Sequence, residues 1–240
     1  MQENKPPLYV CPSPALLHLY DVSGSIVVII DVLRATSTIC TALFHGAKRV
    51  IPVASVEECI QKGEELQAIT AGERDGIIAS GLQHGNSPFE YPVSFIKNKT
   101  LVLTTTNGTR LLDMASDAKQ IITGSFPNLT PVCNYLLHQN QPVILGCAAW
   151  KDRVNLEDML FAGAVVNSIK EKFYINCDSA FIAETLYLHA KDNLYACMQH
   201  ASHFHRLAKH GLEEDIKYCL TIDIAPSLPI LKDGALINIC

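Results

Sequence analysis

A carboxylate and a guanidinium follow directly after an apolar run near the start of the chain. Residues 27–38 read VVIIDVLRATST, so Asp31 ends a buried-strand pattern and Arg34 stands three positions later. Thr36 and Ser37, with a third hydroxyl after them, then open a helical pattern. Hydroxyls and backbone N–H groups at the positive end of a helix dipole suit an anion such as phosphate. The alternative is that the hydroxyls cap the helix and that Asp31 and Arg34 form a structural ion pair.

A second segment of the same kind, TTTNGTR at 104–110, also follows a strand-like run and leads into a helical one. Its hydroxyls and backbone N–H groups would face one point, and the arginine would add a bidentate phosphate partner. Ordinary helix capping is again the alternative. Two junctions with the same chemistry favour an anion site, whose residues in this segment would be Thr106, Asn107, Gly108, Thr109 and Arg110.

Carboxylates stand near other predicted strand ends. Glu73 lies in a GERDG loop, and an NLED segment carries Glu157 and Asp158 at a predicted helix start. Oxygen ligands of this kind suit Mg²⁺, which usually takes one or two carboxylates together with phosphate and water. For NLED, capping is the alternative, with Asn155 as the N-cap and Asp158 reaching back to it.

Two well-known phosphatase motifs begin like segments of this chain but are incomplete. The motif of haloacid dehalogenase-type phosphatases needs a second aspartate two positions after Asp31, where this chain has Leu33. Cys147 and Arg153 have the Cys-x5-Arg spacing of cysteine-dependent phosphatases, but bulky and charged residues (AAWKD) replace the small ones of that loop. A buried thiol at a strand end is therefore favoured for Cys147 over a nucleophile.

The elements that must position these residues follow a regular alternation. Strand-length apolar runs, each followed by a helical pattern, occur at 25–31, 49–54, 99–105, 119–125 and 141–148. This alternation predicts a layered α/β/α fold with a mixed, largely parallel sheet. Ligands bind beyond the carboxyl ends of such strands, which is where the polar segments lie. From about residue 177 the pattern becomes helical, so we expect a single compact domain over 1–240, or two lobes with a helix-rich C-terminal part.

Composition excludes several kinds of partner. The formal net charge of −5 gives no basic surface for nucleic acid. No apolar stretch reaches the ~18 residues of a membrane helix, and no signal-peptide pattern opens the chain, so no membrane partner is expected. The nine cysteines lack zinc-site spacing and indicate free thiols in the cytoplasm. A homo-oligomer is the default expectation for a soluble enzyme.

Other motifs that carry chemistry are missing. Four histidines cluster at 200–210 without an HExxH motif, and we interpret them as surface or packing residues. No GxGxxG or GxxxxGK[ST] segment supports binding of a dinucleotide or a nucleoside triphosphate.

Taken together, the order and spacing of these segments resemble the 2-phosphosulfolactate phosphatase family over about 25–235. The motifs that carry the resemblance are VVIIDVLRATST, GER-x-G, GNSP at 85–88, TTTNGTR, GS-x-x-N at 124–128, and LED followed by Ala162 and Gly163. The resemblance implies an α/β enzyme that uses Mg²⁺ to hydrolyse 2-phospho-3-sulfolactate to 3-sulfolactate and phosphate, in coenzyme M biosynthesis. One departure is Ala149, which stands where the family tends to have glycine.

The chemistry of the residues and the resemblance together predict the site. Asp31, Glu73 and Asp158 would supply carboxylates for Mg²⁺, with Glu157 a weaker candidate. Asp31, Arg34 and Glu73 would be catalytic. The phosphate would contact Arg34, Thr36, Ser37 and the turn from Asn107 to Arg110, and Asn86 and Ser87 would contact the carboxylate or sulfonate end.

Two questions stay open at the level of sequence. A metal-activated water is the favoured attacking group, with an aspartyl-phosphate at Asp31 as the alternative. The substrate is expected to be a small phosphorylated anion. Alternatives are a Mg²⁺-dependent phosphatase for another small phosphorylated carboxylic acid, and a non-catalytic anion-binding protein.

Overall fold

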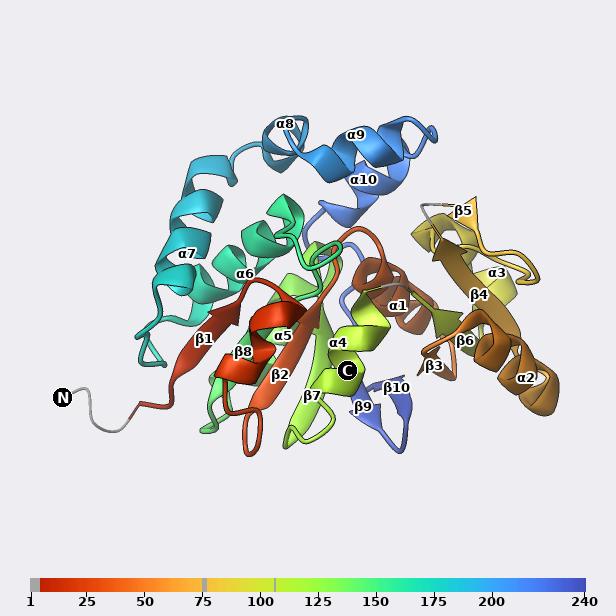
Figure 1. The fold of residues 1–240 in the computed structure, drawn as a ribbon, viewed down its shortest axis with the longest axis horizontal. Helices are drawn as coiled ribbons and strands as arrows, with labels where there is room; N and C mark the ends of the chain where they lie inside the picture. The colour runs from red at the N-terminus through yellow and green to blue at the C-terminus, as the bar shows by residue number, and fades with distance from the viewer. Residues whose placement is uncertain (1–4, 75–76, 106) are drawn as a thin grey trace.

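One mixed sheet runs through the molecule. The computed structural model describes residues 5–74, 77–105 and 107–240, and ten strands among them form the order β1-β8-β2-β7-β9-β10-β3-β6-β4-β5 (Figure 1). The strands are β1 (Leu8–Cys11), β2 (Ile26–Ile30), β3 (Arg49–Val53), β4 (Ile69–Arg74), β5 (Ile77–Ile78), β6 (Thr100–Thr104), β7 (Gln120–Gly124), β8 (Val143–Cys147), β9 (Pro229–Lys232) and β10 (Ala235–Asn238).

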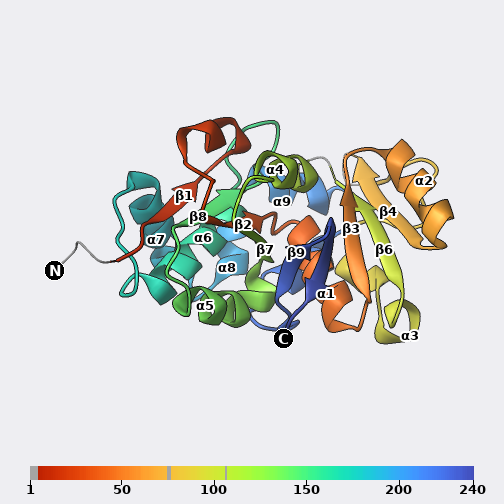
Figure 2. The ribbon, with the colours of Figure 1, turned by 90° about the horizontal axis from the view of Figure 1, so that it is seen from below.

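The sheet consists of two parallel blocks joined by a hairpin. Strands β1, β8, β2 and β7 pair in parallel, as do β3, β6 and β4. The C-terminal hairpin β9–β10 pairs antiparallel with β7 on one side and with β3 on the other, and Figure 2 shows it between the two blocks. The C-terminal hairpin therefore joins the two parallel blocks into one continuous sheet.

Strand β2 is buried on both faces, which explains its uninterrupted apolar sequence. Val28 and Ile30 pack in one cluster, whereas Val27 and Ile29 pack in another on the opposite face, because successive side chains of a strand alternate. Helices cover both faces, so Asp31 emerges from a strand enclosed in a core.

Helices form the outer layers and a C-terminal cap. α5 (Leu129–Leu137), α6 (Leu156–Ile169) and α7 (Asp178–Ala190) cover one face of the first block, and α4 (Gly108–Met114) with the 3₁₀ helix η1 (Pro14–Leu19) covers the other. α1 (Ala35–Phe44) and α3 (Val93–Ile96) pack on one face of the second block, and α2 (Val56–Leu66) packs on the other. The cap contains α8 (Leu194–Met198), α9 (Ser202–Ala208) and α10 (Glu213–Cys219). Short 3₁₀ helices are η2 (Pro88–Glu90) and η3 (Phe126–Asn128).

The predicted fold class is confirmed, with a mixed and mostly parallel sheet between helices. The five predicted strands correspond to β2, β3, β6, β7 and β8. The prediction for GERDG was wrong in one respect: Glu73 belongs to strand β4 and pairs with Ile78 of β5, so it is not a loop residue. Within the described part of the chain, no helix is both long enough and apolar enough to cross a membrane.

Gly163 sets the distance between α6 and α7. A Cβ atom added there would lie 1.9 Å from the carbonyl oxygen of Ala183 on α7, and backbone cannot yield as a flexible side chain would. We expect Gly163→Ala to destabilise the fold by about 1–3 kcal/mol, although alanine has the higher helix propensity. Urea unfolding tests this. Ser168→Ala on the same helix is the control, and a Gly163→Ala midpoint equal to that control would contradict the packing argument.

Candidate active site

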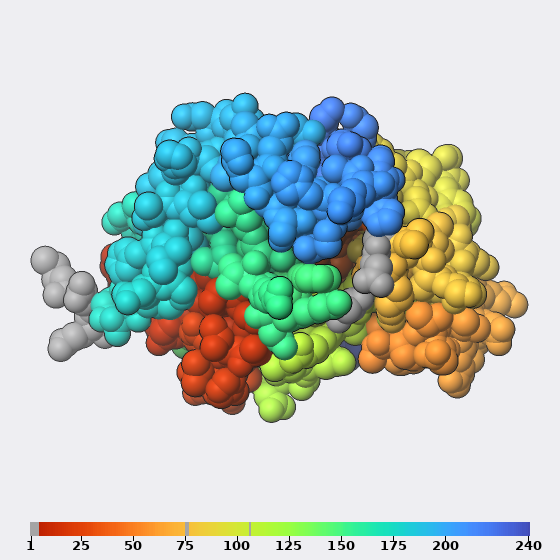
Figure 3. Space-filling view, turned by 45° about the horizontal axis from the view of Figure 1, so that its top comes forward, coloured from red at the N-terminus to blue at the C-terminus, as the bar shows by residue number. Residues whose placement is uncertain are grey.

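A pocket of about 280 Å³ opens where the two parallel blocks and the C-terminal cap meet. In the space-filling view the hollow is bounded by the blue C-terminal segment, the green segment after β8 and the yellow segment after β4 (Figure 3). Its wall includes residues at or just after the ends of β2, β4, β6 and β8, which are Asp31, Glu73, Thr105 and Ala149. This position beyond the carboxyl ends of strands is the one that the sequence predicts.

The turn from β2 to α1 exposes Asp31 to the pocket and turns its hydroxyls away. Thr36 Oγ1 donates to the carbonyl oxygen of Asp31 at 2.8 Å, and Ser37 Oγ donates to the carbonyl oxygen of Val32 at 2.7 Å. Both hydroxyl residues are buried and neither lines the pocket. Thr36 and Ser37 therefore fix the turn that presents Asp31, whereas the sequence predicted that they would contact phosphate.

Arg34 reaches the pocket while it is held from behind by the cap. Its Nη1 donates to Asp215 Oδ1 of α10 at 2.6 Å, and the two side chains are 5% and 9% exposed. The alternative ion pair between Asp31 and Arg34 is not the one that forms. Residues that lie 181 positions apart thus fix a guanidinium beside the end of β2.

The turn from β6 to α4 contributes through its backbone and two side chains. Thr105 and Asn107 line the pocket, and Gly108 lies so close to Asp31 that a Cβ there would be 3.1 Å from Asp31 Oδ2. The hydroxyl of Thr109 lies 3.3 Å from that of Thr105, inside the turn. The predicted contact at Thr106 lies outside the described residues.

Arg110 does not join this group. Its Nη1 donates to Asp152 Oδ1 at 2.8 Å on the protein surface, and its side chain is 50% exposed. The sequence predicted a phosphate partner at this position, but the side chain is not part of the pocket wall.

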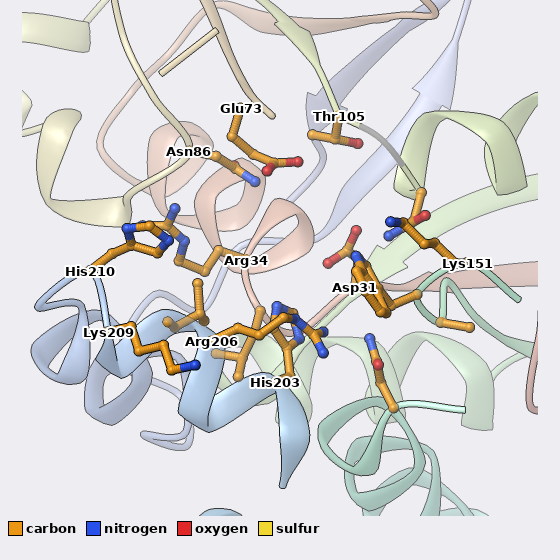
Figure 4. A pocket seen from close by; sticks show the side chains of 16 residues that line it. Asp31, Arg34, Glu73, Asn86, Thr105, Lys151, His203, Arg206, Lys209 and His210 are labelled. Carbon is orange, nitrogen blue, oxygen red and sulfur yellow. The ribbon is translucent and has the colours of Figure 1, made fainter. Parts of the chain in front are cut away.

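Glu73 and Asn86 form the wall beside the second block (Figure 4). Asn86 is buried, and among the described residues its Oδ1 has no hydrogen-bond partner. Ser87, predicted alongside it, caps the 3₁₀ helix η2 by accepting from the N–H of Phe89. Of the predicted pair, only Asn86 faces the pocket.

Asp158 connects three elements. Its Oδ1 accepts from the N–H of Val32 at 3.0 Å, and its Oδ2 accepts from the N–H of Ala149 at 3.2 Å. The predicted bond back to Asn155 does not form, because both oxygens serve these strand-to-helix turns. Burial and the neighbouring Glu157 raise the pKa of Asp158 well above its usual value. The carboxyl thus holds the site's backbone together and does not line the pocket.

Glu157 is enclosed behind a histidine. Its Oε1 accepts from His203 Nδ1 of α9 at 2.5 Å, and its Oε2 is buried without a hydrogen-bond partner among the described residues. His203 lines the pocket, whereas Glu157 does not. Among the late histidines, which the sequence predicted to be surface or packing residues, His203 is half-buried and His210 is exposed, and both belong to the pocket wall.

Sequence reasoning missed the basic side of the pocket. Arg206 and Lys209 from the α9 segment line it together with His203 and His210, and Figure 4 shows them across from Glu73 and Thr105. The available signal was spacing, because residues 203, 206 and 210 stand at i, i+3 and i+7 and so share one helical face. The pocket consequently combines two carboxylates with several cationic side chains.

The loop after β8 adds Trp150 and Lys151 to the wall. Trp150 and Arg153 exchange both backbone hydrogen bonds, at 2.9 and 3.0 Å, and Lys151 and Asp152 between them have φ of 51° and 61°. Ala149 also has a positive φ, 57°, which is the conformation that favours glycine. Such left-handed non-glycine residues are uncommon and concentrate at functional sites.

Asp31 has an altered acidity. The pKa of this carboxyl is raised to about 6. Burial is the main cause, and the nearby carboxylates of Glu73 and Glu157 also raise the pKa, whereas His203 lowers it in part. The ionised form is thus disfavoured by the protein alone. A cation bound beside Asp31 would remove that penalty.

Cys147 does not line the pocket. It is fully buried, its Sγ lies 3.9 Å from the sulfur of Met159, and burial raises the pKa of its thiol well above the ordinary value. A thiolate nucleophile requires the opposite environment. We expect Cys147→Ala to keep kcat within about 3-fold of wild type, because no reacting group is removed. An inactive but folded Cys147→Ala, with folding checked by circular dichroism, would contradict this assignment.

A pocket of this kind, with two half-buried carboxylates together with arginine and lysine side chains at the rim of an α/β sheet, defines an enzyme site for a small, highly charged anion. A family model described as 2-phosphosulpholactate phosphatase matches residues 11–234. The chain belongs to this family.

Curated relatives agree with the family match over most of both chains. A protein of Caldanaerobacter subterraneus subsp. tengcongensis named "Probable 2-phosphosulfolactate phosphatase" is 40% identical over 218 residues, which are 89% of this chain and 90% of that protein. A Thermotoga maritima protein of the same name is 41% identical, covering 88% and 90%. A Clostridium acetobutylicum protein, also of that name, is 34% identical, covering 90% and 93%.

Proposed function

We propose that this chain hydrolyses 2-phospho-3-sulfolactate to 3-sulfolactate and inorganic phosphate. The observation that carries the proposal is that Asp31 and Arg34, both in the turn from β2 to α1, line one pocket together with cationic side chains from the cap. The substrate carries phosphate, carboxylate and sulfonate groups, so it needs several positive partners at once. The family match supplies the substrate.

The phosphate is assigned to the side of the pocket formed by the strand ends. Arg34 is held in place by Asp215, and a preorganised guanidinium stabilises phosphoryl charge at little reorganisation cost. Asn107 lines the same pocket as Asp31, and the missing side chain of Gly108 leaves room for the Asp31 carboxylate at the start of α4. Positioning and charge stabilisation are what phosphoryl transfer mainly asks of a protein.

Mg²⁺ fits this site as a partner of Asp31 and Glu73. The described residues contain no group of three or more histidine, cysteine or acidic side chains close enough to hold a metal. Mg²⁺ does not need one, because it is usually held by one or two carboxylates, waters and substrate phosphate. Burial raises the pKa of Asp31 more than His203 lowers it, so a bound cation would favour the ionised carboxylate. The ion would supply charge against the phosphoryl oxygens and acidify a water molecule.

The cytoplasm is the proposed location. All nine cysteines are free thiols, and this favours a reducing compartment. The net charge of −5 favours a small-molecule substrate over nucleic acid.

A substrate panel tests the function. Purified protein is incubated with 2-phosphosulfolactate, 2-phospholactate and 3-phosphoglycerate, each with Mg²⁺ and with EDTA, and released phosphate is measured. We expect the highest kcat/KM for 2-phosphosulfolactate and no turnover in EDTA. A higher kcat/KM for a phosphorylated acid without sulfonate would contradict the proposed substrate, and full activity in EDTA would contradict the metal.

A further inference from the structure

We propose that Arg206 of α9 binds the sulfonate of the substrate and so determines its specificity. This inference rests on the proposed function and assigns one group of the substrate to one side chain. The pocket holds more cationic groups than a phosphate monoester needs, and those on α9 and the loop after β8 stand on elements separate from the β2–α1 and β6–α4 turns.

Among the cationic side chains of the pocket wall, Arg206 has a buried N–H group that is free to donate a hydrogen bond. Its Nη2 is buried and has no hydrogen-bond partner among the described residues. Its Nη1 makes one long bond, 3.4 Å, to Ser202 Oγ. A buried charged donor without a partner is costly, which favours an anionic ligand as the missing acceptor.

Trp150 fixes the orientation of this guanidinium. The Cζ atom of Arg206 lies 4.0 Å from the centroid of the Trp150 ring, within the range of a cation–π contact. Trp150 is itself held by the tight turn to Arg153. A guanidinium stacked on an aromatic face keeps its in-plane N–H groups for an oxyanion.

The geometry of the substrate indicates which anion this is. The phosphoryl ester and the carboxylate share one carbon, whereas the sulfonate is one carbon further away. With the phosphate beside Asp31 and Arg34, the sulfonate is the group best able to reach the cap across the pocket. Asn86 stands beside Glu73 on the other wall (Figure 4). We assign the carboxylate of the substrate to that side. The exposed ammonium groups of Lys151 and Lys209 add positive charge near the sulfonate.

Substrates that lack one group at a time test the assignment. Arg206→Met, which keeps most of the side-chain length without the charge, is assayed with 2-phosphosulfolactate, with 2-phospholactate and with phosphorylated 2-hydroxyethanesulfonate. We expect kcat/KM to fall about 10- to 100-fold for the two sulfonates and much less for 2-phospholactate, because a charged hydrogen bond is lost only with the sulfonates. Arg206→Lys should recover part of the loss. Arg153→Met on the neighbouring exposed arginine should leave all three values unchanged.

A binding measurement separates this inference from the proposed function. Trp150 is the only tryptophan of the chain, so its fluorescence reports on the pocket. We expect 3-sulfolactate to change the emission of wild type, with a Kd at least 10-fold weaker in Arg206→Met, and lactate to show no such difference. Equal losses for all three phosphorylated substrates, or an unchanged Kd for 3-sulfolactate, would overturn the assignment. Sulfolactate binding by a wild type that releases no phosphate would instead contradict the proposed function while leaving the sulfonate site supported.

Discussion

Replacing Asp31 with asparagine is expected to abolish phosphate release, with kcat at least about 10³-fold below wild type. The amide would keep the shape of the side chain but remove the charge that holds Mg²⁺ or attacks phosphorus, and metal-ion catalysis contributes several kcal/mol. The measurement is phosphate release from 2-phosphosulfolactate at saturating Mg²⁺. Asp117→Asn makes the same chemical change at an exposed position and should leave kcat unaltered.

The same substitution is expected to stabilise the metal-free protein. The pKa of Asp31 is about 6 in the folded protein, against 3.8 for an ordinary aspartate in an unfolded chain. This group therefore favours the folded state fully only below pH 3.8, and the advantage is lost as the pH rises through 6. At pH 8 the ionised carboxylate opposes folding by roughly 1–3 kcal/mol. In EDTA, Asp31→Asn should therefore unfold at a higher temperature than wild type, by more at pH 8 than at pH 5.

Asp31→Asn is expected to lower activity and to raise the stability of the metal-free protein, and this combination distinguishes a functional residue from a structural one. A variant that lost both activity and stability would show that Asp31 supports the fold, and wild-type activity would remove it from the site. Acid quenching during turnover addresses the route. We expect no phosphate bound to the protein, whereas acid-stable phosphate on Asp31 would establish the aspartyl-phosphate alternative.

Asp215→Asn is expected to have the largest effect on stability. The substitution leaves the buried Arg34 guanidinium without its carboxylate, and removal of one partner from a buried ion pair costs about 3–5 kcal/mol. Because α10 carries Asp215 and the β2–α1 turn carries Arg34, the pair also connects the cap to the catalytic turn. Urea unfolding measures the loss of stability. We also expect kcat/KM for 2-phosphosulfolactate to fall, because Asp215 no longer holds the Arg34 guanidinium in position.

The neighbouring Glu214 provides the matched control. It pairs with Lys217 at 2.6 Å on the surface, where its side chain is 74% exposed. Exposed pairs contribute little, so Glu214→Gln should change the free energy of unfolding by less than about 1 kcal/mol. If Asp215→Asn and Glu214→Gln shifted the urea midpoint equally, the buried pair would not have the structural weight assigned to it.

The sequence allowed the sheet and one side of the pocket to be predicted. Apolar runs that end in polar residues located Asp31 and Arg34 correctly at the rim, because strand burial and the placement of ligands at strand ends are local patterns. The partner of Arg34 could not be read in the same way, since Asp215 lies far along the chain and only tertiary packing brings it close.

The main omission was the basic side of the pocket, although the helix-rich C-terminal part was predicted. The histidines of this segment were predicted to be surface or packing residues, and nothing in α9 alone indicates that one of its faces turns toward a pocket. Conversely, Thr36 and Ser37 looked like phosphate ligands, but each hydroxyl has a backbone carbonyl within reach at its own turn. Local hydrogen-bonding alternatives of this kind are invisible until the backbone path is known.

The most direct test of the account is the appearance of both products when the purified wild-type chain and Mg²⁺ are given 2-phospho-3-sulfolactate. Inorganic phosphate and 3-sulfolactate should form in equal amounts over many turnovers, and formation of both should stop when EDTA is added. No release of phosphate from this substrate by folded, Mg²⁺-supplied protein would contradict the proposed function.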